Sequence, residues 1–138
     1  MNLEITPHAV SKLPLRGLSI LVVDDSSDYR DLLTLRLQRV GASITPVDSG
    51  FAALEEIQKN DFDVILMDIQ MPKMDGLRTI RRMREQGIKT PIITVTALKD
   101  ILKLSVTETK DIAAHAGKPT DVPDLVETII GVLAIRDL

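Results

Sequence analysis

The sequence contains no cysteine and no tryptophan, and its other aromatic residues are few. Without cysteine, the chain can form neither a disulfide framework nor a zinc site with Cys ligands. The aromatic side chains are Tyr29, Phe51 and Phe62. So few rings do not provide the stacking platforms on which single-stranded nucleic acids bind.

Long apolar runs and an excess of one charge are also missing. No apolar stretch approaches the roughly 20 residues that cross a bilayer, and the N-terminus lacks the charged start and apolar block of a signal peptide. The net charge of -3 comes from acidic and basic residues mixed along the chain, which leaves no basic stripe for DNA or RNA. We therefore expect a cytoplasmic protein without a direct membrane or nucleic-acid partner.

The sequence has 138 residues, which is a usual length for one domain. Residues 1–16 include Pro7 and Pro14 and show no clear period, which predicts an N-terminal extension or linker before a domain spanning 17–138. From Gly17 on, short apolar runs alternate with amphipathic stretches. The predicted strands are 18–23, 43–47, 64–67 and 91–95, and the predicted helices lie near 27–40, 50–59, 77–86 and 122–133.

This alternation of strands and helices predicts an α/β fold with a parallel sheet that is covered on both faces. Residues 98–104 suggest a further helix, 105–111 are polar, and 112–116 form only a weak candidate for a fifth strand. Five strand-helix units in a chain of this length predict a doubly wound, flavodoxin-like (βα)5 domain with strand order 2-1-3-4-5. In such folds, ligands bind at the carboxyl ends of the strands.

Acidic side chains follow two of the predicted strands where each strand ends. Asp24 and Asp25 come directly after the first apolar run, and Asp68 directly after the third. A single Asp there often does no more than begin a polar loop, but neighbouring parallel strands would bring all of these carboxylates together. Like charges held close destabilise a fold unless a cation compensates, and oxygen ligands suit a hard divalent ion. The pattern predicts a site for Mg²⁺ or Mn²⁺.

Two further polar groups belong to the same predicted edge. Thr96 ends the fourth apolar run, and Lys118 follows the weak fifth strand. Alone, each fits an ordinary strand or surface position. Together with the carboxylates, a hydroxyl and an ammonium supply what phosphoryl transfer requires, namely positioning and neutralisation of oxygen charge. A carboxylate can then be the covalent acceptor.

Four segments carry a family resemblance: LVVDD at 21–25, ILMDIQMPKMDG at 65–76, PIITVTA at 91–97 and KP at 118–119. In order and spacing they resemble the motifs of CheY-like response-regulator receiver domains of two-component systems, and the resemblance covers roughly 18–133. The segment from Met67 to Gly76 is the most specific.

The resemblance implies that Asp68 accepts a phosphoryl group from a phosphohistidine. It implies that Asp25 and Asp68 bind Mg²⁺ together with the backbone carbonyl of Gln70, and that Asp24 helps directly or through water. It also implies that Thr96 binds a phosphoryl oxygen and that Lys118, before a cis proline bond, pairs with Asp68 or its phosphate.

Three positions of this chain are expected to tune that chemistry. His115 stands where the family usually carries an aromatic residue that rotates on activation with Thr96, and histidine adds a titratable group there. Gln70 and Leu98 lie two residues beyond Asp68 and Thr96, where side chains orient or exclude the water that removes the phosphoryl group. Because Leu98 cannot hold a water by hydrogen bonds, slow dephosphorylation is predicted.

Other functions compete with this interpretation. A haloacid-dehalogenase-type hydrolase also uses a strand-terminal Asp and Mg²⁺, but it needs a second Asp where this chain has Gln70. A flavin-binding domain would meet repulsion between its phosphate and the Asp24-Asp25 pair. A degenerate receiver that acts only as an interaction module is disfavoured because Asp24, Asp25, Asp68, Thr96 and Lys118 are all present.

The receiver interpretation implies a signalling role and no metabolic enzyme activity, apart from promoting its own phosphorylation and dephosphorylation. The expected partners are a histidine kinase dimerisation domain or a histidine phosphotransfer protein, and a phosphorylation-dependent homodimer is a further expectation. The segment before Leu18, with Pro14, resembles the linker ahead of the receiver in a hybrid sensor histidine kinase. We expect the signal to leave by protein contact.

Overall fold

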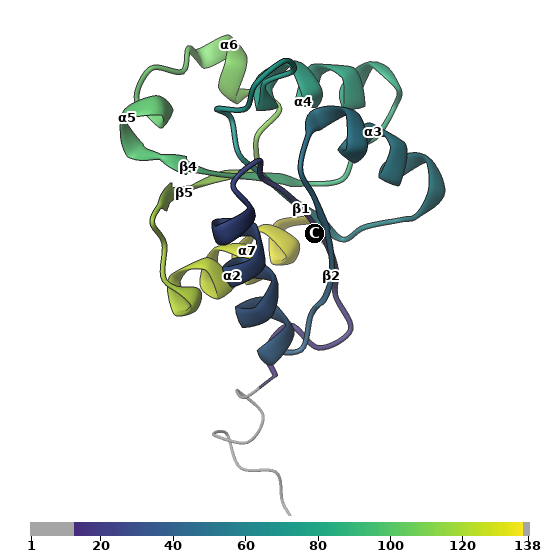
Figure 1. Ribbon diagram of the computed structural model, residues 1–138, viewed down its shortest axis with the longest axis vertical. Coiled ribbons are helices and arrows are strands. Elements are labelled where there is room, and N and C mark those ends of the chain that lie inside the picture. The colour runs from purple at the N-terminus through teal and green to yellow at the C-terminus, as the bar shows by residue number, and fades with distance from the viewer. Residues whose placement is uncertain (1–12, 137–138) are drawn as a thin grey trace, which may run out of the picture.

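The computed structural model describes residues 13–136, and the first part of the predicted linker lies outside the described residues. A five-stranded parallel sheet forms the middle of the domain (Figure 1). Its strands are β1 (Ser19–Val23), β2 (Ser43–Val47), β3 (Val64–Met67), β4 (Ile92–Ala97) and β5 (Ala114–Lys118). Their spatial order is β2-β1-β3-β4-β5, and every neighbouring pair is parallel. The predicted fold class and strand order are confirmed.

Helices cover both faces of this sheet (Figure 1). α2 (Ser27–Arg39) and α7 (Val122–Arg136) pack on one face, and α3 (Gly50–Lys59) and α4 (Gly76–Glu85) pack on the other. Successive strand residues point to opposite faces, so Val22 joins the core beneath α2 and α7 while Leu21 joins the core beneath α3 and α4. No helix among residues 13–136 has the length and apolar character needed to span a bilayer.

Side-chain caps determine where these helices begin. The Ser26 hydroxyl accepts a hydrogen bond from the first turn of α2, the Ser49 hydroxyl does so for α3, and the Asp75 carboxylate does so for α4. Such caps satisfy backbone N–H groups that have no partner inside the helix. The cap Ser26 ends the short loop after β1, and the cap Asp75 ends the longer loop after β3.

The segment between β4 and β5 differs from the prediction. Two short helices, α5 (Leu98–Ile101) and α6 (Val106–Thr109), stand where one helix and a polar stretch were expected. The second helix forms because Ser105 and Glu108 make a capping box, in which each side chain accepts a hydrogen bond from the other's backbone N–H. The fifth strand begins at Ala114, two residues after the predicted start.

The two ends of the described region pack against the domain. Leu15 is fully buried in the core, and its N–H donates to the Val40 carbonyl at 2.9 Å. The packed structure therefore begins before Gly17, where the sequence predicted the domain to start. At the other end, Arg136 in the last turn of α7 forms an ion pair with Asp63, whose carboxylate lies 3.6 Å from the guanidinium just before β3.

Candidate functional site

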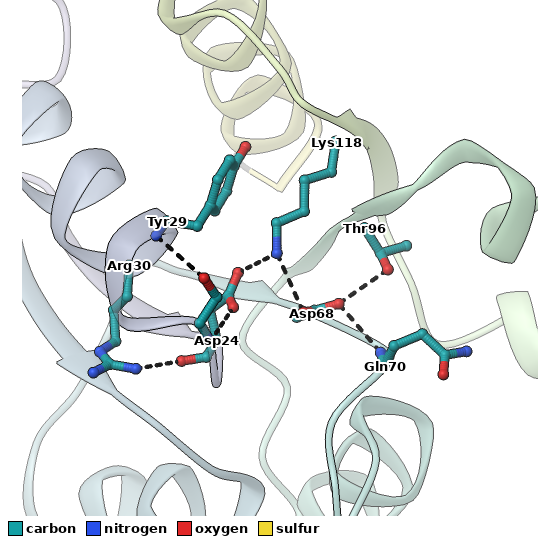
Figure 2. Close-up of polar contacts among 8 residues, drawn as sticks. Asp24, Tyr29, Arg30, Asp68, Gln70, Thr96 and Lys118 are labelled. Atoms are coloured by element: carbon teal, nitrogen blue, oxygen red, sulfur yellow. Dashed lines mark hydrogen bonds and ion pairs between the residues drawn. The ribbon is translucent and has the colours of Figure 1, made fainter.

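The polar residues that the sequence placed at strand ends meet at one edge of the sheet (Figure 2). Asp24 and Asp25 directly follow β1, Asp68 directly follows β3, Thr96 lies near the end of β4, and Lys118 is the last residue of β5. Because these strands are parallel neighbours in the order β1-β3-β4-β5, their carboxyl ends share this edge. Residues that are far apart in the sequence therefore form one cluster.

Asp68 lies at the centre of the cluster and is only 6% exposed. Its Oδ1 accepts hydrogen bonds from the Thr96 hydroxyl at 2.9 Å and from the Gln70 backbone N–H at 3.2 Å. Its Oδ2 accepts from the Lys118 ammonium at 3.3 Å. The carboxylate is thus held in one orientation, with donors on both oxygens.

Asp24 is more deeply buried, at 2% exposure, and both of its carboxylate oxygens also have partners. Oδ1 accepts from the Ser26 N–H at 2.8 Å, and Oδ2 accepts from Lys118 at 2.7 Å. The Arg30 guanidinium donates to the Asp24 carbonyl at 2.7 Å. The carboxylate of Asp24 and the loop that carries it are therefore fixed from two directions.

Lys118 joins the two buried carboxylates. Burial acts to lower the pKa of its ammonium, but hydrogen bonds and charge attraction from Asp24 and Asp68 outweigh burial and raise the pKa above the ordinary value. The Lys118 side chain therefore stays positively charged at neutral pH. It can then pair with any anionic oxygen added to Asp68.

The acidic cluster fits a divalent cation. Asp24, Asp25 and Asp68 each offer a carboxylate oxygen, and these oxygens lie within 4.8 Å of one another. Lys118 compensates one of the negative charges, which leaves the excess that a divalent ion would neutralise. Asp25 is exposed and, within residues 13–136, accepts no hydrogen bond, so its oxygens are available to a metal. Oxygen donors of this kind suit Mg²⁺ and Mn²⁺.

Comparison with protein-family models decides the family. The model of the response regulator receiver domain matches residues 20–130. The chain belongs to this family. Over 103 residues this receiver domain is also 36% identical to the sensor histidine kinase GacS of Pseudomonas protegens, a match that covers 67% of the chain and 11% of GacS. The chain spans about a tenth of the length of such curated relatives.

Solved structures agree with the family. The receiver domain of a Francisella response regulator is 26% identical and superposes with a TM-score of 0.78, covering 87% of this chain and 99% of that one. The response regulator TrrA of Thermotoga maritima, in complex with Mg²⁺ and BeF, is 28% identical with a TM-score of 0.75, covering 83% of this chain and 98% of TrrA. Two-component signalling is therefore the setting of this receiver domain.

The predicted tuning residues His115, Gln70 and Leu98 are all exposed. His115 is exposed on β5, and its Nδ1 contacts the hydroxyl of buried Thr94 on the neighbouring strand rather than a residue of the cluster. The ring is nevertheless partly shielded from water by its neighbours, and this desolvation lowers the pKa of the His115 imidazole. The side chain of Gln70 is exposed, as is Leu98, which is 60% exposed at the start of α5. Their roles in switching and dephosphorylation stay predictions.

Sequence reasoning missed two residues of the site. Tyr29 was noted only as one of the few aromatic residues, yet the centroid of its ring lies 4.3 Å from the Lys118 ammonium. Its place in the first turn after Asp25 was the available signal. Gly76 was noticed only as part of a motif. A Cβ there would overlap the Asp68 carbonyl oxygen and lie 2.8 Å from the Ile69 Cα. Glycine at this position lets α4 approach the backbone of Asp68.

Proposed function

We propose that Asp68 is the phosphoacceptor of this receiver domain and takes its phosphoryl group from a phosphohistidine. The observation that carries the proposal is the setting of Asp68, a buried carboxylate with Thr96 and Lys118 as donors and two further carboxylates beside it. A carboxylate oxygen of Asp68 attacks phosphorus and the P–N bond to the imidazole breaks. The imidazole keeps the electron pair of that bond and takes a proton from solvent as it leaves. The product is an acyl phosphate.

The neighbours of Asp68 have distinct tasks in this proposal. The Thr96 hydroxyl donates to a phosphoryl oxygen, and the Lys118 ammonium pairs with another, so charge that develops during transfer is stabilised by groups already in place. A divalent cation held by Asp24, Asp25, Asp68 and the carbonyl of Gln70 would neutralise further oxygen charge. The complex of the related TrrA with Mg²⁺ and BeF supports this assignment. Hydrolysis then transfers the phosphoryl group to water and regenerates the carboxylate.

The partners follow from the same proposal. A histidine kinase dimerisation domain or a histidine phosphotransfer protein supplies the phosphohistidine, and the likeness to GacS supports a donor of this kind. The signal leaves by protein contact, with a phosphorylation-dependent homodimer as one form of output. A hydrolase of the haloacid-dehalogenase type is disfavoured because Gln70 stands where that chemistry needs a second Asp.

Mass spectrometry tests the phosphoacceptor directly. Incubation of the chain with Mg²⁺ and a small phosphodonor should add one phosphoryl group, and peptide mapping should place it on Asp68. Asp68→Asn should abolish the modification because an amide cannot form the acyl phosphate. Asp61→Asn is the matched control, since Asp61 is an exposed carboxylate upstream of β3, and it should be modified like the wild type. Equal modification of Asp68→Asn would overturn the assignment.

A further inference from the structure

Lys118 has a contact that lies outside the acidic pair. Its Nζ lies 4.3 Å from the centroid of the Tyr29 ring, well inside the range of about 6 Å over which an aromatic face attracts a cation. Figure 2 shows the ring beside the Lys118 side chain, with the hydroxyl pointing away from Asp24 and Asp68. The Lys118 side chain is 21% exposed. Partial exclusion of water strengthens a contact of this kind.

The ring differs from the other partners of Lys118 in one respect. Asp24 and Asp68 are candidate ligands of a divalent cation, and Asp68 is the proposed phosphoacceptor, so their oxygens are engaged when the site is loaded. The face of Tyr29 binds neither a hard cation nor a phosphoryl oxygen. Among the contacts described, it is the one that Lys118 can keep both before and after the cation and the phosphoryl group bind.

Lys118 needs such a partner because its stem is flexible. A lysine side chain is a point charge on four rotatable carbons, and much of its conformational freedom is lost when it is held in one place. Tyr29 itself is held by α2, whose first turn is fixed when the Tyr29 N–H donates to the Ser26 hydroxyl. Ser26 in turn donates from its backbone to Asp24. The ring is therefore attached to the same loop as the acidic cluster.

We propose that Tyr29 is a positioning residue whose ring face holds the Lys118 ammonium where it meets a phosphoryl oxygen on Asp68. This inference rests on the proposed function and adds a residue to it. Tyr29 acts through Lys118 and touches neither the phosphoryl group nor the reacting carboxylate. A simpler role exists, because Tyr29 also packs against the core beneath α2 and α7, and the experiment must separate the two.

Binding of beryllium fluoride in saturating Mg²⁺, measured by calorimetry on the full chain, reports on Lys118 without any turnover. Tyr29→Leu should weaken this binding severalfold, and Tyr29→Phe should restore it to within about twofold, since an unsubstituted ring keeps the same electrostatic face. Affinity for Mg²⁺ alone should stay within about twofold in both variants. Leu35→Ala, an exposed position on the same helix, is the control for general changes in α2.

A series of graded ring substitutions at position 29 means that the test does not depend on a single variant. Phenylalanine at position 29 is replaced by difluorinated and then pentafluorinated phenylalanine, which keep the shape of the ring while weakening its negative face. Affinity for beryllium fluoride should fall stepwise along this series, and the series should become flat in a Lys118→Ala background. A flat series with Lys118 present, or a parallel loss of Mg²⁺ affinity, would show that Tyr29 acts only by packing.

The two proposals fail in different ways. If the wild-type chain neither binds beryllium fluoride nor gains a phosphoryl group on Asp68, the proposed function is wrong. If the wild type does both and the ring series is flat, the function stands and the role given to Tyr29 is wrong.

Discussion

The two oxygens of Asp68 have different surroundings, with the Thr96 hydroxyl and the Gln70 N–H on one and Lys118 on the other. Sequence reasoning identifies Thr96 and Lys118 as members of this site because strand ends can be read from apolar runs. It does not show which oxygen each one meets, since that depends on rotamers and on the twist of the sheet. Tyr29 was missed for a related reason: its helical period indicates packing, and only the fold brings β5 beside it.

The lifetime of the phosphorylated state is predicted to depend on Leu98 and Gln70. Leu98 offers no hydrogen bond to a water aligned with phosphorus, and positioning alone can contribute several kcal/mol to a barrier. The wild type should therefore lose its phosphoryl group slowly. Leu98→Glu or Leu98→Asn should speed first-order decay severalfold after the donor is removed, and Gln70→Leu should slow it. An unchanged decay rate in Leu98→Glu would show that this position has no control over the water.

Stability is predicted to depend on pH through His115. Partial desolvation lowers the pKa of His115 in the folded state below its ordinary value of 6.5, so the unfolded chain binds the proton first as pH falls. The contribution is fully present above pH 6.5 and is lost as pH falls through the lower pKa of the folded state. Urea unfolding of the wild type and His115→Gln at pH 7.5 and 5.5 measures this. The wild type should lose more stability than the variant between these pH values, and parallel losses would contradict the prediction.

At the scale of the element, strands and helices were easier to predict where their hydrophobic pattern was longer. The continuous apolar runs of β1 and β3 are typical of strands buried on both faces, and both strands form as expected. Between β4 and β5, the short helix α5 lies inside the helix predicted at 98–104, whereas the four residues of α6 are too few to show a helical period. The readable signal for α6 was the Ser105 and Glu108 spacing of a capping box, which starts a helix without any apolar stripe.

Gly76, the first residue of α4, lies close to the backbone of Asp68, and this close approach gives a prediction. Gly76 donates its N–H to the Ile69 carbonyl at 2.9 Å, and an added methyl group would overlap the carbonyl of Asp68. Because the obstacle is backbone, Gly76→Ala should destabilise the domain by about 1–3 kcal/mol and also reduce phosphorylation of Asp68. Chemical unfolding and intact-mass measurement check the two effects. Gly131→Ala, with open space around its Cβ, is the matched control. Wild-type stability in Gly76→Ala would refute the steric argument.

For the whole molecule, the order of the strands is what assembles the site. The alternation of strands and helices predicted that order correctly, and with it the meeting of Asp24, Asp68 and Lys118. The N-terminal boundary of the packed structure was harder to predict from the sequence. Leu15 lies between Pro14 and Arg16 without a surrounding period, so nothing local indicates that it is fully buried.

Metal binding should stabilise the entire fold. A ligand that binds only the native state raises the free energy of unfolding by about 2.7 kcal/mol at a hundredfold excess over its Kd. Thermal melts should therefore shift upward with Mg²⁺. Asp25→Asn should weaken Mg²⁺ binding more than Asp24→Asn, because both Asp24 oxygens already accept hydrogen bonds whereas Asp25 is exposed and accepts none within residues 13–136. Equal wild-type melts with and without Mg²⁺ would remove the metal from the proposal.

The packing of Leu15 before β1 and of Arg136 beside the start of β3 has a consequence for the side from which Asp68 can be reached. Both places lie at the amino ends of parallel strands, whereas Asp68 and its neighbours lie at the carboxyl ends. Leu15 and Arg136 therefore lie on the side of the domain opposite the acidic cluster. In the proposed function, a donor that carries phosphohistidine would therefore reach Asp68 at the edge of the sheet that lies away from both Leu15 and Arg136.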